Sequence, residues 1–238
     1  MMTDLAPAIE LGWVGRLFLF GLLVGVPIIA VLQPIDRSIP LPPRRDLYLS
    51  GVVGTLALGA LVWLALWIEG VPLAAVGLHE VDSLRFLAWT GATALGALAG
   101  NFAITRAAAA FGVEESRLTY HLMPRERGER RLFLALSAAA GLGEEFTYHG
   151  FAVAGLAAWT GSGWWAAVIA NLAFGVLHGY QGQVGMARAA LIGMVLTLPV
   201  ILGAGLWPSI AAHFLVDALL GLWLWKWMIP GKRVQAEI

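Results

Sequence analysis

Two adjacent carboxylates, Glu144 and Glu145, stand inside an apolar stretch that runs from Leu132 to Ala158. If this stretch crosses a bilayer, a single ionised side chain at its centre costs about 2.5–3.5 kcal/mol on insertion scales, and two neighbouring carboxylates also repel each other. Such a pair is expected to face a protein interior or a wet cavity. A carboxylate in a partly dry cavity is a good general base for water, so the pair points to hydrolysis.

The plainer alternative for these two residues is a buried structural pair, in which Glu145 bonds to Tyr148 or His149. Intramembrane ionisable groups are by default functional, so we favour the site over the structural pair.

Two further apolar stretches carry polar groups at helical spacing. His213 and Asp217 are four residues apart, so on a helix they share one face. The aspartate can then hold one ring nitrogen and fix the direction of the other. Phe174 and His178 are also four apart, although His178 by itself could equally be an ordinary interfacial residue.

This inventory limits the chemistry. The chain contains no cysteine, and no serine or threonine has the setting of a nucleophile elbow. Histidines beside a carboxylate can donate hydrogen bonds to a developing oxyanion or bind a metal that activates water. Hydrolysis of a peptide bond is the simplest reaction that fits. Proton-coupled transport is the alternative, because Glu and His in membrane helices also form proton relays.

Composition predicts the class of protein that positions these groups. The 238 residues are 59% hydrophobic and 13% charged, with a mean hydropathy of +0.78 and zero formal net charge. Soluble domains carry about 25% charged residues. We therefore expect an all-α, polytopic membrane protein with a single domain over residues 1–238. The zero net charge gives no support to nucleic-acid binding, and the lack of cysteine excludes disulfides and thiolate metal sites.

Apolar runs long enough to cross a bilayer recur along the chain and predict about seven (seven to eight) transmembrane helices, with the site in the C-terminal bundle. In the polar connection after the third run, residues 107–120 are predicted to form an interfacial amphipathic helix. The expected spans are 11–32, 47–68, 84–104, 132–158, 164–179, 189–206 and 207–228.

Lys and Arg concentrate in the loops after the first, third and fifth spans and at the C-terminal end. By the positive-inside rule this predicts an outside N-terminus and a cytoplasmic C-terminus. At 1.5 Å per residue, Glu144 lies about 18 Å along the helix from Leu132. His178 and His213 then lie near opposite ends of their spans, so the residues meet only if a span is broken, tilted or shifted.

The three polar runs resemble the motifs of the CPBP family, the CAAX-type prenyl proteases and bacteriocin-processing (Abi) proteins. That family shows Glu-Glu-x-x-x-Arg, Phe-x-x-x-His and His-x-x-x-Asn/Asp in successive helices. Order and helix placement agree here, and the resemblance covers a core of about 132–227. The matching positions are Glu144, Glu145 and His149, then Phe174 and His178, then His213 and Asp217.

The resemblance implies roles for these positions. Glu144 would activate water, and Glu145 would be its partner. His178 and His213 would position water or the oxyanion, with Asp217 supporting His213. The family is described both as metalloprotease and as glutamate-type protease. The His-Glu-x-x-His motif of zincins is absent, so we expect no cofactor. A divalent metal such as zinc, held by His178, His213 and Glu144, stays the alternative.

One position departs from the family pattern. His149 stands where the family has arginine, whose guanidinium would hold Glu145 in a bidentate manner. Histidine can do so only when protonated, or as a neutral hydrogen-bond donor. The departure leaves open a subfamily with a different supporting shell, or a non-proteolytic immunity-type member. The implied partners are the lipid bilayer and a protein or peptide substrate with a membrane-associated segment, in the bacterial inner membrane.

Overall fold

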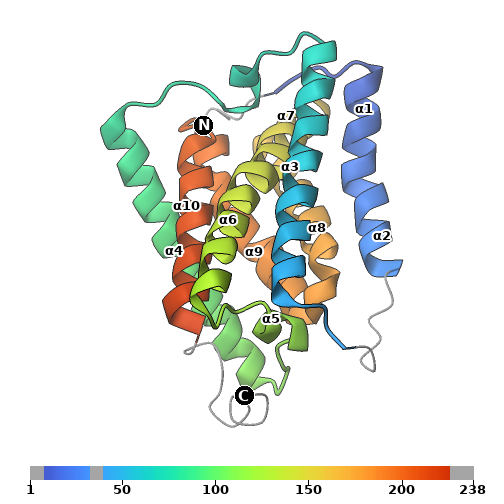
Figure 1. Cartoon of the computed structure of the whole chain (residues 1–238). Helices are drawn as coiled ribbons and strands as arrows, with labels where there is room; N and C mark the ends of the chain where they lie inside the picture. The colour runs from blue at the N-terminus through green and yellow to red at the C-terminus, as the bar shows by residue number, and fades with distance from the viewer. Residues whose placement is uncertain (1–7, 33–39, 226–238) are drawn as a thin grey trace.

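The computed structural model describes residues 8–32 and 40–225, which form helices joined by turns and short loops (Figure 1). The all-α prediction is confirmed for these ranges. Part of the Pro- and Arg-rich loop, including Arg37, and the basic C-terminal residues Lys226, Lys232 and Arg233 lie outside them.

Most of the chain folds into long helical rods, several of which change their winding part-way. The first rod joins α1 (Trp13–Phe20), the π-helical turn η1 (Gly21–Gly25) and α2 (Val26–Leu32). The central rod joins α6 (Arg127–Glu144), the π-helix η3 (Glu145–Ala152) and α7 (Val153–Thr160). The other elements are α3 (Arg44–Ile68), η2 (Leu73–Val76), α4 (Ser83–Ala110), α5 (Arg117–His121), α8 (Gly163–Leu177), η4 (His178–Gln181), α9 (Gly182–Ile201), α10 (Trp207–Leu219) and η5 (Leu220–Leu224).

Within the described ranges, five helical runs are long and apolar enough to cross a membrane: Trp13–Leu32, Arg44–Ile68, Ser83–Ala110, Gly163–Ile201 and Trp207–Leu224. The run Gly163–Ile201 divides at η4 into two packed helices, α8 and α9. The rod Arg127–Thr160 is also long, but its polar residues lower its hydropathy. The structure is therefore that of a polytopic helical membrane protein.

One predicted element is wrong. Residues 107–120 do not form a single interfacial helix. Instead, α4 continues to Ala110, the chain turns at Gly112 with a φ of +68°, and the short helix α5 begins at Arg117. The positive φ explains the break, because only glycine adopts it at little cost.

The rod α6–η3–α7 lies between the other helices and contacts α3, α8 and α10 (Figure 1). Small residues allow this close approach, as in other membrane bundles. A Cβ atom added to Gly143 would lie 2.7 Å from the backbone oxygen of Thr55 in α3, and one added to Gly141 would lie 2.9 Å from the backbone oxygen of Ile210 in α10. The helix that carries the glutamate pair is thus held on two sides by backbone contact.

The start of α6 is fixed by a network at the end of the bundle that carries α5. The carboxylate of Glu129 accepts hydrogen bonds from the backbone N–H groups of Arg125 and Glu126, at 2.7 and 3.2 Å, and forms an ion pair with Arg44 at 3.5 Å. Arg44 also donates to the backbone oxygen of His121, at 2.6 Å. These contacts join α3, α5 and α6.

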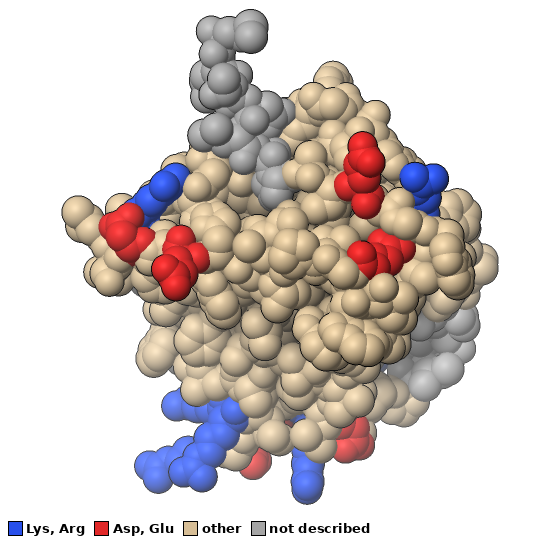
Figure 2. Space-filling model, turned by 90° about the horizontal axis from the view of Figure 1, so that it is seen from above, with Lys and Arg blue, Asp and Glu red and all other residues tan. Residues whose placement is uncertain are grey.

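Figure 2 views the bundle from the end opposite α5, and tan residues make up most of this face. Charged side chains stand towards its rim; several basic ones lie along one edge, and others lie beside acidic side chains elsewhere on the rim. The middle of the bundle therefore presents few charges in this direction.

Candidate active site

The glutamate pair lies where the central rod changes from α-helix to π-helix. Glu144 ends α6, and Glu145 begins η3. A π-helical turn widens the backbone and often marks a functional site. Glu145 and His149 are both fully buried, with 0% exposed surface. Glu144 is only half-buried. The two neighbouring carboxylates therefore differ in their exposure.

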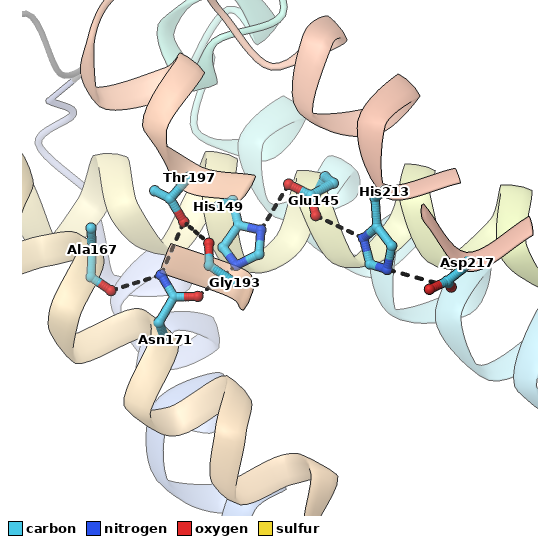
Figure 3. A network of polar contacts seen from close by, with 8 residues as sticks. All are labelled: Glu145, His149, Ala167, Asn171, Gly193, Thr197, His213 and Asp217. Atoms are coloured by element: carbon cyan, nitrogen blue, oxygen red, sulfur yellow. Dashed lines mark hydrogen bonds and ion pairs between the residues drawn. The ribbon is translucent and has the colours of Figure 1, made fainter. Parts of the chain in front are cut away.

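Glu145 is held by two imidazole rings. Its Oε2 atom lies 2.7 Å from Nδ1 of His149, one helical turn along η3, and its Oε1 atom lies 2.8 Å from Nδ1 of His213 in α10 (Figure 3). An ionised carboxylate is acceptor-only, so both rings donate to it in that state. With both oxygens engaged, Glu145 is poorly placed to take a proton from water.

Asn171 of α8 fixes the other side of the His149 ring. Its Nδ2 atom donates to the backbone oxygen of Ala167 at 2.9 Å, and its Oδ1 atom lies 2.9 Å from Nε2 of His149. A carbonyl oxygen can only accept, so the amide nitrogen must face Ala167. The amide oxygen therefore faces His149, and Nε2 of His149 must carry a hydrogen.

A threonine completes this chain of hydrogen bonds. The Asn171 amide nitrogen also donates to the hydroxyl of Thr197 in α9 at 2.9 Å, and that hydroxyl donates to the backbone oxygen of Gly193 at 2.7 Å (Figure 3). A Cβ atom at Gly193 would lie 2.0 Å from Oδ1 of Asn171 and 3.2 Å from Nε2 of His149. Glycine at this position leaves room for the contact between the two side chains.

His213 lies between two acidic side chains. While Nδ1 faces Glu145, Nε2 lies 3.6 Å from Oδ2 of Asp217, four residues further along α10. That separation is longer than a hydrogen bond, so the second nitrogen is not fixed by Asp217 alone.

His178 begins the 3₁₀ turn η4 at the end of α8. Its Nδ1 atom lies 2.8 Å from the backbone oxygen of Phe174 and must donate to it. In the neutral ring, Nε2 then bears the lone pair. The Phe174 ring packs edge-on against His178, with centroids 4.5 Å apart, and against His149, with centroids 5.2 Å apart.

A cavity of about 230 Å³ lies next to the polar network and is lined in part by His178 and His213. Glu144 lines it and, among the residues that the structure describes, its carboxylate has no hydrogen bond or ion pair. Residues from α4, α5, α6, α8, α9 and α10 form the walls, and four residues of the motifs stand in them with Glu144: Phe174, His178, His213 and Asp217.

The comparisons with known proteins agree with this arrangement. Residues 128–219 match the family described as type II CAAX prenyl endopeptidase Rce1-like. This region is therefore similar to the CAAX-protease family. It contains the glutamate pair, both cavity histidines and Asp217. No curated protein and no solved structure matches the chain.

The six polar residues among the seven motif positions fall into two groups. Glu145, His149, His213 and Asp217 form one continuous polar network, whereas Glu144 and His178 line the cavity without a direct contact to each other. The predicted spans had placed His178 and His213 near opposite ends of the bundle. The cavity removes the difficulty, because it reaches both residues and Glu144.

A metal was the alternative for this site. Within the described ranges, no three His, Asp or Glu side chains are grouped so that they could hold a metal ion. Nδ1 of His213 is engaged by Glu145, and Nδ1 of His178 donates to a carbonyl group. The residues therefore do not form a preorganised three-ligand site, and no step below passes through a metal.

Several polar residues at or beside the site were not predicted. Asn171 and Thr197 support His149, while Asn101 and Arg188 line the cavity. A polar side chain inside an apolar span was the available signal for Asn101, Asn171 and Thr197. The sequence does not indicate which helices bring them together.

Proposed function

We propose that the chain is a CAAX-type intramembrane endopeptidase in which Glu144 activates the attacking water. The supporting observation is the difference between the two carboxylates. Glu145 is held by two ring N–H groups, whereas Glu144 faces the cavity without a partner among the described residues. A general base must reach the proton it takes, and of the two carboxylates only that of Glu144 is free to do so.

The other groups divide the remaining tasks. His178 presents a lone pair at Nε2 in its neutral form, so it accepts a hydrogen bond from the water and orients it. His213 holds Glu145 through Nδ1, and its Nε2 atom lies 3.6 Å from Oδ2 of Asp217. Both His213 and Asp217 line the cavity. When Nε2 of His213 carries a hydrogen, it donates to the oxyanion that forms on the substrate carbonyl.

The reaction then balances in two steps. Glu144 takes one proton from water while the water oxygen bonds to the carbonyl carbon, which gives a tetrahedral oxyanion beside His213. The C–N bond next breaks, and the proton held by Glu144 passes to the leaving nitrogen. The products are a new carboxylic acid and an amine, the acid's proton then passes to the amine to give a carboxylate and an ammonium group, and Glu144 has regained its ionised form.

The proposed substrate is a protein or peptide with a lipidated or membrane-embedded segment at the cut. The cavity lies within a bundle of membrane-crossing helices, and this location suits a substrate held at the bilayer. The inner-membrane location and cytoplasmic C-terminus inferred from the basic loops form part of this proposal.

The experiment compares Glu144→Gln with Glu80→Gln, a matched control in an exposed loop position. Purified proteins in lipid nanodiscs receive a farnesylated peptide that ends in Cys-aliphatic-aliphatic-X, and new termini are identified by mass spectrometry. Wild type and Glu80→Gln should release the same C-terminal peptide, whereas Glu144→Gln should release none while remaining folded. Equal cleavage by Glu144→Gln would overturn the assignment. Proton flux without any new terminus would indicate a transporter.

A further inference from the structure

The cavity contains an amide whose hydrogen-bonding capacity is unused. Asn101 of α4 has 0% exposed surface and lines the cavity, yet neither Nδ2 nor Oδ1 has a hydrogen-bond partner among the described residues. Buried polar groups are nearly always paired, because burial without a hydrogen bond is costly. An unpaired carboxamide beside the site therefore points to a ligand that supplies both a donor and an acceptor.

A second unpaired group lies beside Asn101. The guanidinium of Arg188 in α9 pairs with the Glu115 carboxylate through both Nη atoms, and Nη2 also lies 3.2 Å from the Thr105 hydroxyl. Its Nε atom is buried without a partner, and Arg188 lines the same cavity. Thr105 stands one helical turn after Asn101 on α4, so the guanidinium reaches α4 close to the free amide.

These two groups match the end of a peptide. A carboxamide offers an N–H donor and a C=O acceptor, which pair with the C=O and N–H of a peptide group. The Nε–H of arginine donates to a carboxylate oxygen, and hydrogen bonds between charged groups are the stronger kind. Much of the remaining wall is apolar and suits aliphatic side chains; this part includes Leu122, Phe133, Leu136, Ile192, Leu196 and Leu220.

The distance along α9 sets the length of the peptide. Gly193 lies level with the polar network, because a Cβ atom there would be 3.2 Å from Nε2 of His149. Arg188 is five residues earlier on the same helix, which corresponds to about 7.5 Å along its axis. An extended chain advances about 3.3 Å per residue. About two to three residues therefore fit between a bond cut near the network and a carboxylate at Arg188.

We propose that Asn101 and Arg188 form the subsite that binds the C-terminal end of the leaving peptide. Asn101 pairs with one of its peptide groups, and Nε of Arg188 donates to its terminal carboxylate. This subsite rests on the proposed endopeptidase function and gives it a specificity, since it selects a substrate that ends two to three residues after the cut.

The test measures binding separately from cleavage. The probe is the farnesylated tetrapeptide Cys-Val-Ile-Met, prepared with a free C-terminal carboxylate and as its C-terminal amide. Affinity for both is measured on Glu144→Gln in nanodiscs, where the peptide is not consumed, and kcat/KM for both is measured on the unsubstituted protein. The acid is expected to bind at least about tenfold more tightly than the amide and to be cleaved with a correspondingly higher kcat/KM.

Variants in the Glu144→Gln background then assign the preference to its residues. The double change Glu115→Gln with Arg188→Gln removes both members of the buried ion pair, so no charge is left unpaired, and should bring the acid and amide to equal affinity. Asn101→Leu should weaken both peptides by a similar factor and keep the preference. Arg106→Gln, which removes an exposed arginine of α4, should leave both affinities unchanged.

Each outcome has a defined meaning. Equal affinity for acid and amide in the parent protein would overturn the subsite and leave Asn101 and Arg188 as groups that bind only water. A preference that survives Glu115→Gln with Arg188→Gln would also overturn it. If the unsubstituted protein cleaves both peptides equally, the subsite fails and the proposed function stands. If it cleaves neither peptide, the proposed function fails.

Discussion

The Nε2 atom of His149 lies 2.9 Å from the Oδ1 atom of Asn171, and this contact determines how the imidazole holds Glu145. The amide can offer only its oxygen, because its nitrogen is turned to the backbone oxygen of Ala167. Nε2 is therefore a donor, and Nδ1 also donates whenever Glu145 is ionised. The ring then carries both hydrogens and a positive charge, which is the contribution that an arginine would make at this position.

Substitution of His149 tests this equivalence. His149→Arg keeps a permanent positive charge beside Glu145 and should retain activity within about tenfold. His149→Gln offers one hydrogen bond without charge and should lose at least about tenfold, equivalent to about 1.4 kcal/mol in the barrier. The measurement is kcat/KM on the farnesylated peptide across pH.

The contrary result is equally clear for this residue. A His149→Gln enzyme with the wild-type rate and pH profile would show that the ring merely fills space between Glu145 and Asn171.

Asn171 should act through His149 and not on the substrate. Asn171→Leu removes the acceptor for Nε2 and leaves a buried donor unpaired, which costs about 1–3 kcal/mol of stability. We expect a lower melting temperature and at least about tenfold lower kcat, with little change in KM.

Asn171→Asp provides the matched comparison. It keeps an oxygen for His149 but turns another oxygen towards the backbone oxygen of Ala167. We therefore expect it to lose stability and to keep more activity than Asn171→Leu. If both variants cleave at the wild-type rate, the amide has no part in positioning His149.

The two cavity histidines should each be needed for the chemical step. His178→Ala removes the group that orients water, and His213→Ala removes a donor to the oxyanion together with one support of Glu145. Each should lower kcat by about 10²-fold or more, the range found for loss of one oxyanion donor. Single-turnover cleavage measures this directly, and an unchanged rate in either variant would remove that histidine from the mechanism.

Exhaustive chelation provides a separate test of the same residues. The proposed mechanism uses no metal, so the rate should survive dialysis against a strong chelator. Loss of activity that added zinc restores would instead support the metal-assisted alternative through His178, His213 and Glu144.

Glu129, in the first turn of α6 and before the apolar stretch 132–158, should make stability depend on pH. Partial burial raises the pKa of its carboxyl, but the N–H groups of Arg125 and Glu126 and the charge of Arg44 outweigh burial and hold the pKa below its ordinary value. A carboxyl whose pKa is lower in the folded state stabilises the protein above its unfolded-state pKa. The contribution disappears as pH falls through the folded-state pKa.

The variant Glu129→Gln measures this contribution. Its melting temperature in detergent should lie below that of wild type at about pH 7, and the gap should close by about pH 3. A gap that stays constant over this range would show that the carboxylate charge does not hold α6 to α3.

The sequence determined the class of protein and the inventory of the site. Long apolar runs force helices in a bilayer, because backbone polar groups have no water there and must pair within the chain. Against that background the polar side chains of three spans stood out, and their order was enough to suggest the CAAX-protease family. The local error at residues 107–120 arose because one glycine at positive φ ended α4 and allowed a turn.

Tertiary structure decided which contacts each of those residues makes, and therefore which role it can take. Glu144 and Glu145 are neighbours with equal chemistry in the sequence, yet packing gives Glu145 two imidazoles and leaves Glu144 facing the cavity. The contact of Glu145 with His213 spans 68 positions of the chain, and that of His149 with Asn171 spans 22. Helical periodicity predicts which residues share a face of one helix. Which faces meet depends on the close packing of several helices at small residues, and no single stretch of sequence encodes that.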